Sequence, residues 1–165
     1  MNTETVLPAD TQSAINTEET LQLVTFRVGD VLLGIDIAHV QEINRLMDVT
    51  PVPEASAMIH GVVNLRGDVV TVINPHRIFG LPVGEDECHG RNLILNIHGE
   101  RIGVLVDGVS DILTVGRDDL SSPPSNVRAI DRRFIKSVYL RESDLIVIID
   151  PAGLVRVIDA ETSVS

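Results

Sequence analysis

Short apolar runs that meet at tight turns set the strongest limit on how this chain of 165 residues can fold. Valine, isoleucine and leucine dominate the runs, as is typical of β-strands that pack on a core. Their spacing predicts a series of β-hairpins and favours small barrels over a helical bundle or a parallel sheet. The paired runs are 24–28 with 31–35, 59–65 with 69–73, 93–97 with 102–106, and 135–140 with 145–149. Residues 49–52 and 112–115 add two shorter predicted strands.

Short helices are expected at three places between or after these strands. Asp36 can cap a helix that places Val40 and Ile43 on one side, with Glu42 facing elsewhere. The pairs 74–75 and 150–151 each offer a capping side chain followed by proline at the first helical position. Because each of these pairs ends the second strand of a hairpin, we expect two related lobes. The predicted fold class is therefore all-β, with short helices.

The bulk properties of the chain exclude several classes of protein. Its formal charge of -11 disfavours a nucleic-acid partner, because phosphate backbones select lysine and arginine. The single cysteine, Cys88, cannot form an internal disulfide, which fits a reducing compartment. No apolar run approaches the roughly 20 residues needed to cross a bilayer, and the N-terminus lacks a signal-peptide pattern. We expect a soluble cytoplasmic protein without membrane insertion of its own.

The ends of the chain differ in composition from its centre. Residues 1–19 are rich in threonine, glutamate, asparagine and serine, with few apolar side chains to bury. Such a segment cannot offset the entropy lost on ordering, so it is predicted to be a disordered tail. The expected folded domain is 20–160, followed by a short tail at 161–165.

The turn between runs 59–65 and 69–73 is the most distinctive local feature. The pair Gly67-Asp68 fits a two-residue hairpin turn whose glycine accepts a positive φ, which places Arg66 near the exposed end of a rigid ribbon. A planar, permanently charged guanidinium held in this way suits recognition of a partner. Alternatively, Arg66 only forms an exposed ion pair with Asp68, and its substitution would then be silent. The residues alone leave both interpretations open.

The segment Asn64-Leu65-Arg66-Gly67, with Gly61 before it and a strand ending near Asn74 after it, resembles the signature of the CheW family of chemotaxis coupling proteins. Three other segments agree with that family in order and approximate spacing, and together they cover most of residues 21–158. These segments are 26–30, 34–43 and 103–112. The resemblance implies two five-stranded SH3-like barrels side by side, a hydrophobic groove between them, and no catalytic activity.

The resemblance also implies partners and site residues. Proteins of this family join the cytoplasmic tip of methyl-accepting chemotaxis receptors to the regulatory domain of the histidine kinase CheA, so recruitment to membrane-associated receptor arrays is expected. The receptor-binding residues implied are Arg66, Asn64, Leu65, Gly67, Val40 and Glu42. The kinase-binding residues implied are Ile43 and Val49. Helical spacing makes Val40 and Ile43 candidates for the core as well, Leu65 has the same alternative, and the turn itself requires Gly67.

Two positions depart from the family pattern. Where the family commonly reads Pro-x-x-Asp-Leu-Arg after this hairpin, the chain has Thr71, Asn74, Pro75 and His76. Asparagine preserves the helix cap, but a contact made through an arginine at His76 is put in question. The loop 121–124 lacks the usual Pro-x-Pro spacing, which puts the kinase contact of the second lobe in question.

No arrangement typical of an enzyme stands out. The chain has no G-x-S-x-G elbow and no glycine-rich phosphate loop, and its histidines are scattered. We therefore predict no catalytic residues, no cofactor and no metal. One alternative is a ligand-binding or enzymatic barrel that uses the groove, with Glu42, His39 or His60 as polar groups. Another is a CheV-type coupling domain, against which the absence of a receiver domain in this chain argues.

Overall fold

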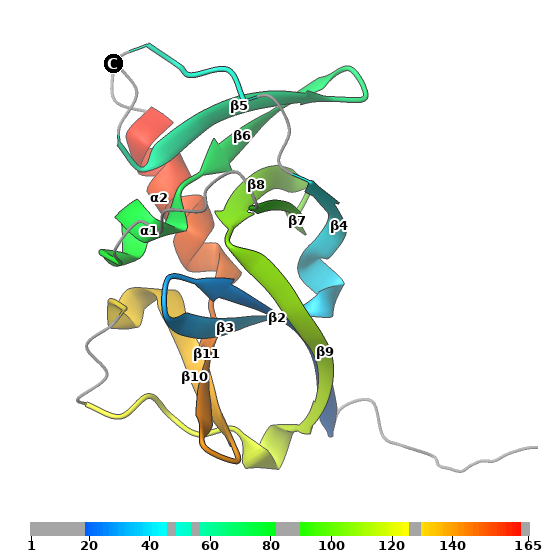
Figure 1. Cartoon of the computed structure of the whole chain (residues 1–165), viewed down its shortest axis with the longest axis vertical. Helices are drawn as coiled ribbons and strands as arrows, with labels where there is room; N and C mark the ends of the chain where they lie inside the picture. The colour runs from blue at the N-terminus through cyan, green and yellow to red at the C-terminus, as the bar shows by residue number, and fades with distance from the viewer. Residues whose placement is uncertain (1–18, 46–48, 54–56, 82–89, 126–129, 163–165) are drawn as a thin grey trace, which may run out of the picture.

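Two five-stranded β-sheets make up most of the computed structural model, which describes residues 19–45, 49–53, 57–81, 90–125 and 130–162 (Figure 1). The strands are β2 (Thr20–Val28), β3 (Val31–Asp36), β4 (Val40–Arg45), β5 (Ile59–Leu65), β6 (Asp68–Ile73), β7 (Arg91–Ile97), β8 (Glu100–Val106), β9 (Gly108–Gly116), β10 (Ile135–Arg141) and β11 (Asp144–Ile149). The helices are α1 (Pro75–Phe79) and α2 (Pro151–Thr162), with 3-10 turns at Ile37–His39, Arg117–Asp119 and Arg132–Phe134. The all-β prediction is confirmed.

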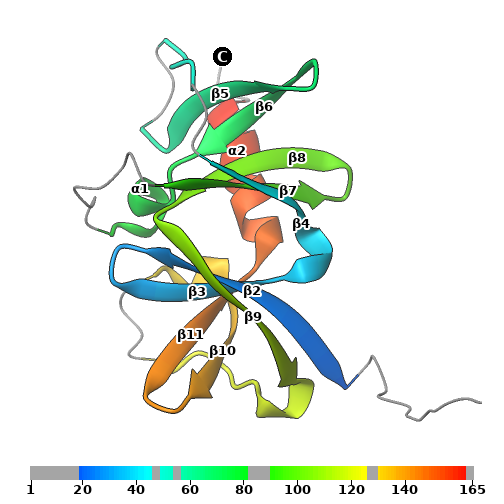
Figure 2. The same ribbon diagram turned by 45° about the vertical axis from the view of Figure 1, so that its right-hand side comes forward.

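The two sheets have the same internal order. One runs β10-β11-β3-β2-β9 and the other β5-β6-β8-β7-β4, and in both a single parallel pair joins two hairpins. Along the chain, a hairpin, a strand, a second hairpin and a helix occur twice, from β2 to α1 and from β7 to α2. We call these two stretches the first and second repeat. Each sheet contains the first hairpin of one repeat together with the single strand and the second hairpin of the other. The two predicted lobes are therefore interwoven, and β9 crosses from the neighbourhood of one sheet into the other (Figure 2).

Neither sheet closes into a barrel by a continuous ladder within the described residues. After β4 the chain makes one bridge to β5, between Thr50 and Val62, and after β9 it makes one bridge to β10, between Ser121 and Val138. The predicted strand at 49–52 is thus reduced to a bridge, whereas the one predicted at 112–115 is part of the longer β9. The number of strands per lobe was predicted correctly, but the sheets are curled and open.

The predicted helix after Asp36 is wrong beyond its first turn. The Asp36 carboxylate accepts a hydrogen bond from the Ala38 amide at 2.9 Å, but only the short turn Ile37–His39 follows. The chain then becomes β4, which pairs with the edge of β7. An unpaired strand edge offers backbone partners, and this tertiary pairing overrides the helical spacing of the apolar residues. As a result Val40 is half-buried whereas Ile43, expected beside it, is 41% exposed.

The turn of the β5–β6 hairpin lies one residue earlier than predicted. Leu65 pairs with Asp68, so the two turn residues of β5–β6 are Arg66 and Gly67, with φ of 52° and 90°. Positive φ at both central positions is the type I′ geometry, whose twist matches that of the flanking strands. The predicted pair Gly67-Asp68 was therefore wrong. The β7–β8 hairpin turns in the same way, at His98 and Gly99.

The largest hydrophobic core lies between the two sheets. It takes Phe26 and Leu33 from one sheet and Leu93 and Leu95 from the other. Near α1, Phe79 meets Phe134 edge-on, with ring centroids 5.4 Å apart. Two smaller clusters fill the curled sheets, one built from Val63, Leu65, Val70, Val72, Ile94 and Leu105 and the other from Leu21, Leu23, Val115 and Ile148. The shared core joins the two interwoven sheets into one folded unit.

Some sequence predictions fall on residues that the structure does not describe. The predicted N-terminal tail lies outside the described residues apart from Glu19, as does the segment that holds Cys88. At the other end, α2 continues to Thr162, past the predicted domain end at 160. No helix in the described ranges is both long and apolar enough to span a membrane.

Replacing Gly61 by alanine is expected to lower the free energy of unfolding by about 1 to 3 kcal/mol, because a Cβ there would lie 2.5 Å from the Thr50 carbonyl oxygen and 2.5 Å from Val49 Cγ1. Urea denaturation of the whole chain measures this. Gly108→Ala is the matched control, since nothing lies within 4 Å of its added Cβ. Equal midpoints for the two variants would contradict the close approach.

Candidate partner-binding site

The β5–β6 hairpin projects from its sheet and carries Arg66 at the tip (Figures 1 and 2). Leu65, only 5% exposed, anchors the strand end beneath the turn. The side-chain oxygen of Asn64 accepts a hydrogen bond from the Gly67 amide at 3.0 Å, which holds the turn closed. The Arg66 side chain is 69% exposed. A rigid turn thus presents a largely exposed guanidinium.

Glu42 on β4 receives this guanidinium. Arg66 Nη1 lies 2.5 Å from Glu42 Oε2, and Nη2 lies 3.3 Å from Oε1, so the two groups meet in a forked arrangement. The hydrogen bond from Arg66, followed by one from Asn44, holds the pKa of Glu42 below its ordinary value. The same pair raises the pKa of Arg66. Two residues that were predicted separately as receptor contacts therefore form one unit.

The alternative in which Arg66 pairs with Asp68 is wrong. Asp68 instead forms an ion pair with Arg101 of β8, on the adjacent strand of the sheet. Each acidic group near the hairpin tip thus has its own arginine. Since Arg66 is held by Glu42 from another strand, its orientation depends on the curl of the whole sheet rather than on the hairpin alone.

The other predicted site residues divide by exposure. Val40 packs against the core between the sheets, and Val49 packs against the smaller cluster that contains Leu65. Asn64 and Gly67 are exposed at the hairpin tip, and Ile43 is exposed on β4. Ile43 pairs with Leu93 of β7 but belongs to neither of these two clusters, whereas Val49 packs against one of them. The two predicted kinase contacts therefore differ in burial, since Ile43 is exposed and Val49 is half-buried.

Val69 is an exposed apolar residue that was not predicted as part of the site. It is 71% exposed, the highest value among the large apolar side chains of the described residues, and it pairs with Asn64 next to the turn. A two-residue alternation counted from the buried Val70 indicates this exposure. Because the turn was predicted one residue too late, this alternation was not applied to Val69. Val69 adds an apolar contact beside the cation at the tip.

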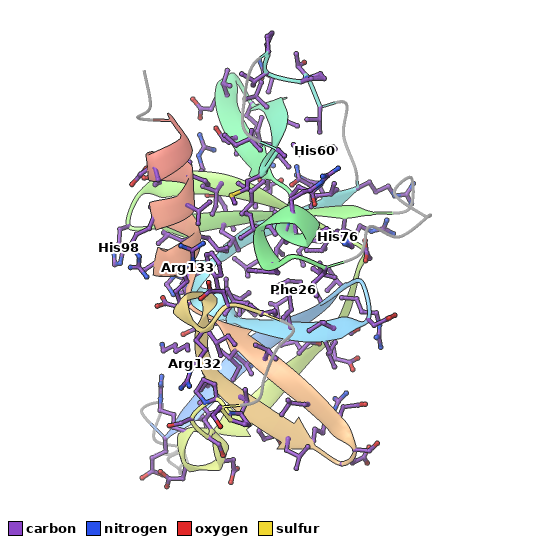
Figure 3. The ribbon with its side chains drawn as sticks, turned by 90° about the vertical axis from the view of Figure 1, so that its left-hand side faces the viewer. Phe26, His60, His76, His98, Arg132 and Arg133 are labelled. Atoms are coloured by element: carbon purple, nitrogen blue, oxygen red, sulfur yellow. The ribbon has the colours of Figure 1, made fainter. Side chains whose placement is uncertain are left out.

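His76, where the family commonly has arginine, has a structural contact instead. Figure 3 shows His76 at α1, where it is 5% exposed. Its Nε2 lies 3.0 Å from Asp107 Oδ1. The other oxygen of Asp107 accepts a hydrogen bond from the Gly29 amide in the β2–β3 turn, at 2.6 Å. This chain of contacts ties one sheet to the other. No group of three or more potential metal ligands occurs in the described part of the chain.

Comparison with known proteins decides the family. The model of the CheW-like domain matches residues 22–159, which is most of the chain. The chain belongs to the CheW family. It is 35% identical to the chemotaxis protein CheW of Treponema pallidum over 141 residues, covering 83% of this chain and 82% of that protein. It is 33% identical to CheW of Rhizobium meliloti over 129 residues, covering 78% of this chain and 83% of that protein.

A solved structure agrees with these relatives. The crystal structure of the scaffolding protein TtCheW from Thermoanaerobacter tengcongensis superposes with a TM-score of 0.76 at 27% identity, covering 85% of this chain and 90% of that one. The resemblance seen in the segments around Arg66 is thereby confirmed. As a CheW-family member, the chain is a non-enzymatic adaptor of chemotaxis signalling.

Removing the Arg66 guanidinium should raise the pKa of Glu42 toward its ordinary value, because the hydrogen bond from Arg66 is the main cause of the lowering. A carbon-detected NMR titration of the Glu42 carboxyl in Arg66→Gln measures this. The pKa of Glu42 is lower in the folded chain, so the contribution of the pair to stability is present above the ordinary glutamate pKa. It is lost as the pH falls through the lowered value. Arg117→Gln, in the 3-10 turn after β9, should leave the titration unchanged, since Arg117 is not among the groups that shift the pKa of Glu42.

Proposed function

We propose that this adaptor couples methyl-accepting chemotaxis receptors to the histidine kinase CheA, in the cytoplasm, at membrane-associated receptor arrays. The observation that carries the proposal is the Arg66 tip, an exposed guanidinium oriented by Glu42 on a rigid hairpin. Family membership supports a role in chemotaxis, and the tip supports binding of a macromolecule over turnover of a substrate. Holding kinase and receptor on one rigid body would make their encounter effectively intramolecular.

Receptor recognition is assigned to the β5–β6 tip. An arginine has five N–H donors, and the forked contact with Glu42 occupies two of the Arg66 nitrogen atoms on one side only. The remaining donors face solvent and can bind carbonyl or carboxylate oxygens of a receptor helix hairpin. Val69, exposed beside the turn, supplies an apolar contact that excludes water from this interaction. Glu42 acts here by orienting Arg66.

Kinase recognition is assigned to the surface around Ile43. This side chain is 41% exposed on β4, an edge strand of its sheet. An exposed apolar residue on a rigid strand suits an interface with a folded domain such as the regulatory domain of CheA. Val49, half-buried against the cluster of Leu65, is proposed as the second kinase contact.

Charge reversal at Arg66 is expected to weaken binding to a receptor cytoplasmic fragment by at least about tenfold, because the receptor would meet two adjacent carboxylates in place of one guanidinium. Co-sedimentation with receptor assemblies measures the affinity of Arg66→Glu. Arg117→Glu, an exposed cation in the 3-10 turn after β9, is the charge-matched control and should bind normally. Normal binding by Arg66→Glu with an unchanged melting temperature would contradict a role of Arg66 in receptor binding.

The variant Ile43→Asp should lose roughly tenfold in affinity for the isolated CheA regulatory domain while its melting temperature stays within a degree or two of the wild type, because the side chain already faces solvent. Leu145→Asp, at 39% exposure on the other sheet, is the matched control. Titration calorimetry with the purified domain makes the measurement. Equal affinity of all three proteins would remove Ile43 from the kinase surface.

A further inference from the structure

A cavity of about 250 Å³ lies between α2 and the turn that precedes β10. Its lining consists of Met58, Arg133, Gly153, Arg156, Val157 and Ala160. None of these residues belongs to β4 or to the β5–β6 hairpin, so the cavity is separate from the residues assigned above to the receptor and the kinase. Figure 3 shows Arg133 beside the end of α2.

The close approach of α2 to the turn Arg132–Phe134 gives the cavity its shape. A Cβ added at Gly153 would lie 2.9 Å from the Arg133 carbonyl oxygen and 3.2 Å from Phe134 Cδ1, so the helix can pack here only through a glycine. The guanidinium of Arg133 lies 4.8 Å from the centre of the Phe134 ring and also pairs with Asp131 at 3.5 Å. These contacts hold Arg133 in place at one wall of the cavity.

Both charged residues in the lining of this cavity are arginines, Arg133 and Arg156. In a chain of formal net charge -11, Arg132 and Lys136 lie on the same turn and the start of β10, together with the acidic residues Asp131 before the turn and Asp159 on α2. In the described ranges Arg132 and Arg156 form no ion pair, and their side chains are exposed. The remaining lining is apolar or small, from Met58, Val157 and Ala160. Two arginines thus flank an apolar floor.

We propose that this cavity docks an acidic segment of another protein, in which carboxylates flank one medium-sized apolar side chain. The apolar side chain would lie against Met58, Val157 and Ala160, and the carboxylates would pair with Arg133 and Arg156. The volume is below the roughly 300–1,000 Å³ of sites for drug-sized ligands, which favours a single side chain over a cofactor. The apolar floor favours a peptide over a simple anion. Binding here leaves the Arg66 tip free.

The test uses the full-length chain and the peptide acetyl-Asp-Glu-Leu-Asp-Glu-amide, followed by amide NMR shifts. The expected shifts centre on Gly153, Arg156 and Val157 and leave Arg66 and Gly67 unmoved. Arg156→Gln, in a side chain with no ion pair among the described residues, should weaken binding roughly tenfold through loss of one charge-assisted contact. Arg117 is also exposed but lies in the 3-10 turn after β9 and does not line the cavity, so Arg117→Gln should bind the peptide like the wild type.

Two further peptides separate the parts of the site. Replacing the central leucine of the peptide by alanine should weaken binding several-fold, and replacing its acidic residues by lysine should abolish it. Equal affinity for the alanine peptide would mean that the arginines attract any anionic segment, which overturns the docking of an apolar side chain. Unchanged binding by Arg156→Gln, or shifts centred on the β5–β6 tip, overturns the site itself.

Discussion

The parallel pairing of β3 with β11, and of β6 with β8, is the constraint on which the rest of the molecule depends. Each of these pairs joins a hairpin from one repeat to a hairpin from the other, and without them each sheet would be split into two pieces. A two-stranded hairpin is marginally stable by itself, whereas a five-stranded sheet with a packed face is stable. The exchange also places the largest core between the sheets, so that neither repeat can bury its apolar face alone.

The partner-binding site also depends on this parallel pairing of strands. Glu42 lies on β4 and Arg66 at the end of β5, which are the two edge strands of one sheet, and β7, β8 and β6 lie between them. Their contact at 2.5 Å therefore requires the sheet to curl until its edges approach each other. The same arrangement recurs in the other sheet, where Arg141 of β10 lies 3.7 Å from Asp111 of β9. The curl, completed by strands of both repeats, is what positions the guanidinium.

Local patterns in the sequence predicted the hairpins and both proline-capped helices, because valine-rich strands and the Asn-Pro and Asp-Pro caps act within a few residues. They misplaced the turn of the β5–β6 hairpin by one residue, since Arg66 adopts a left-handed conformation that is uncommon for residues other than glycine. The helix predicted after Asp36 became β4 because β7, some fifty residues later, offers an edge. The Arg66–Glu42 and His76–Asp107 contacts depend on the curl and on the exchange of hairpins, so no local pattern contains them.

The exchange of hairpins also has a consequence for synthesis on the ribosome. The first hairpin, β2–β3, pairs with β9 and with β11, and β11 is the last strand to be translated. At roughly 5–20 residues per second, the wait between β3 and β11 is on the order of ten seconds. During that time the first hairpin can pair with β9 along one edge, but its other edge has no partner strand. The sheet that contains the first hairpin can therefore be completed only late in synthesis, when β11 has been made.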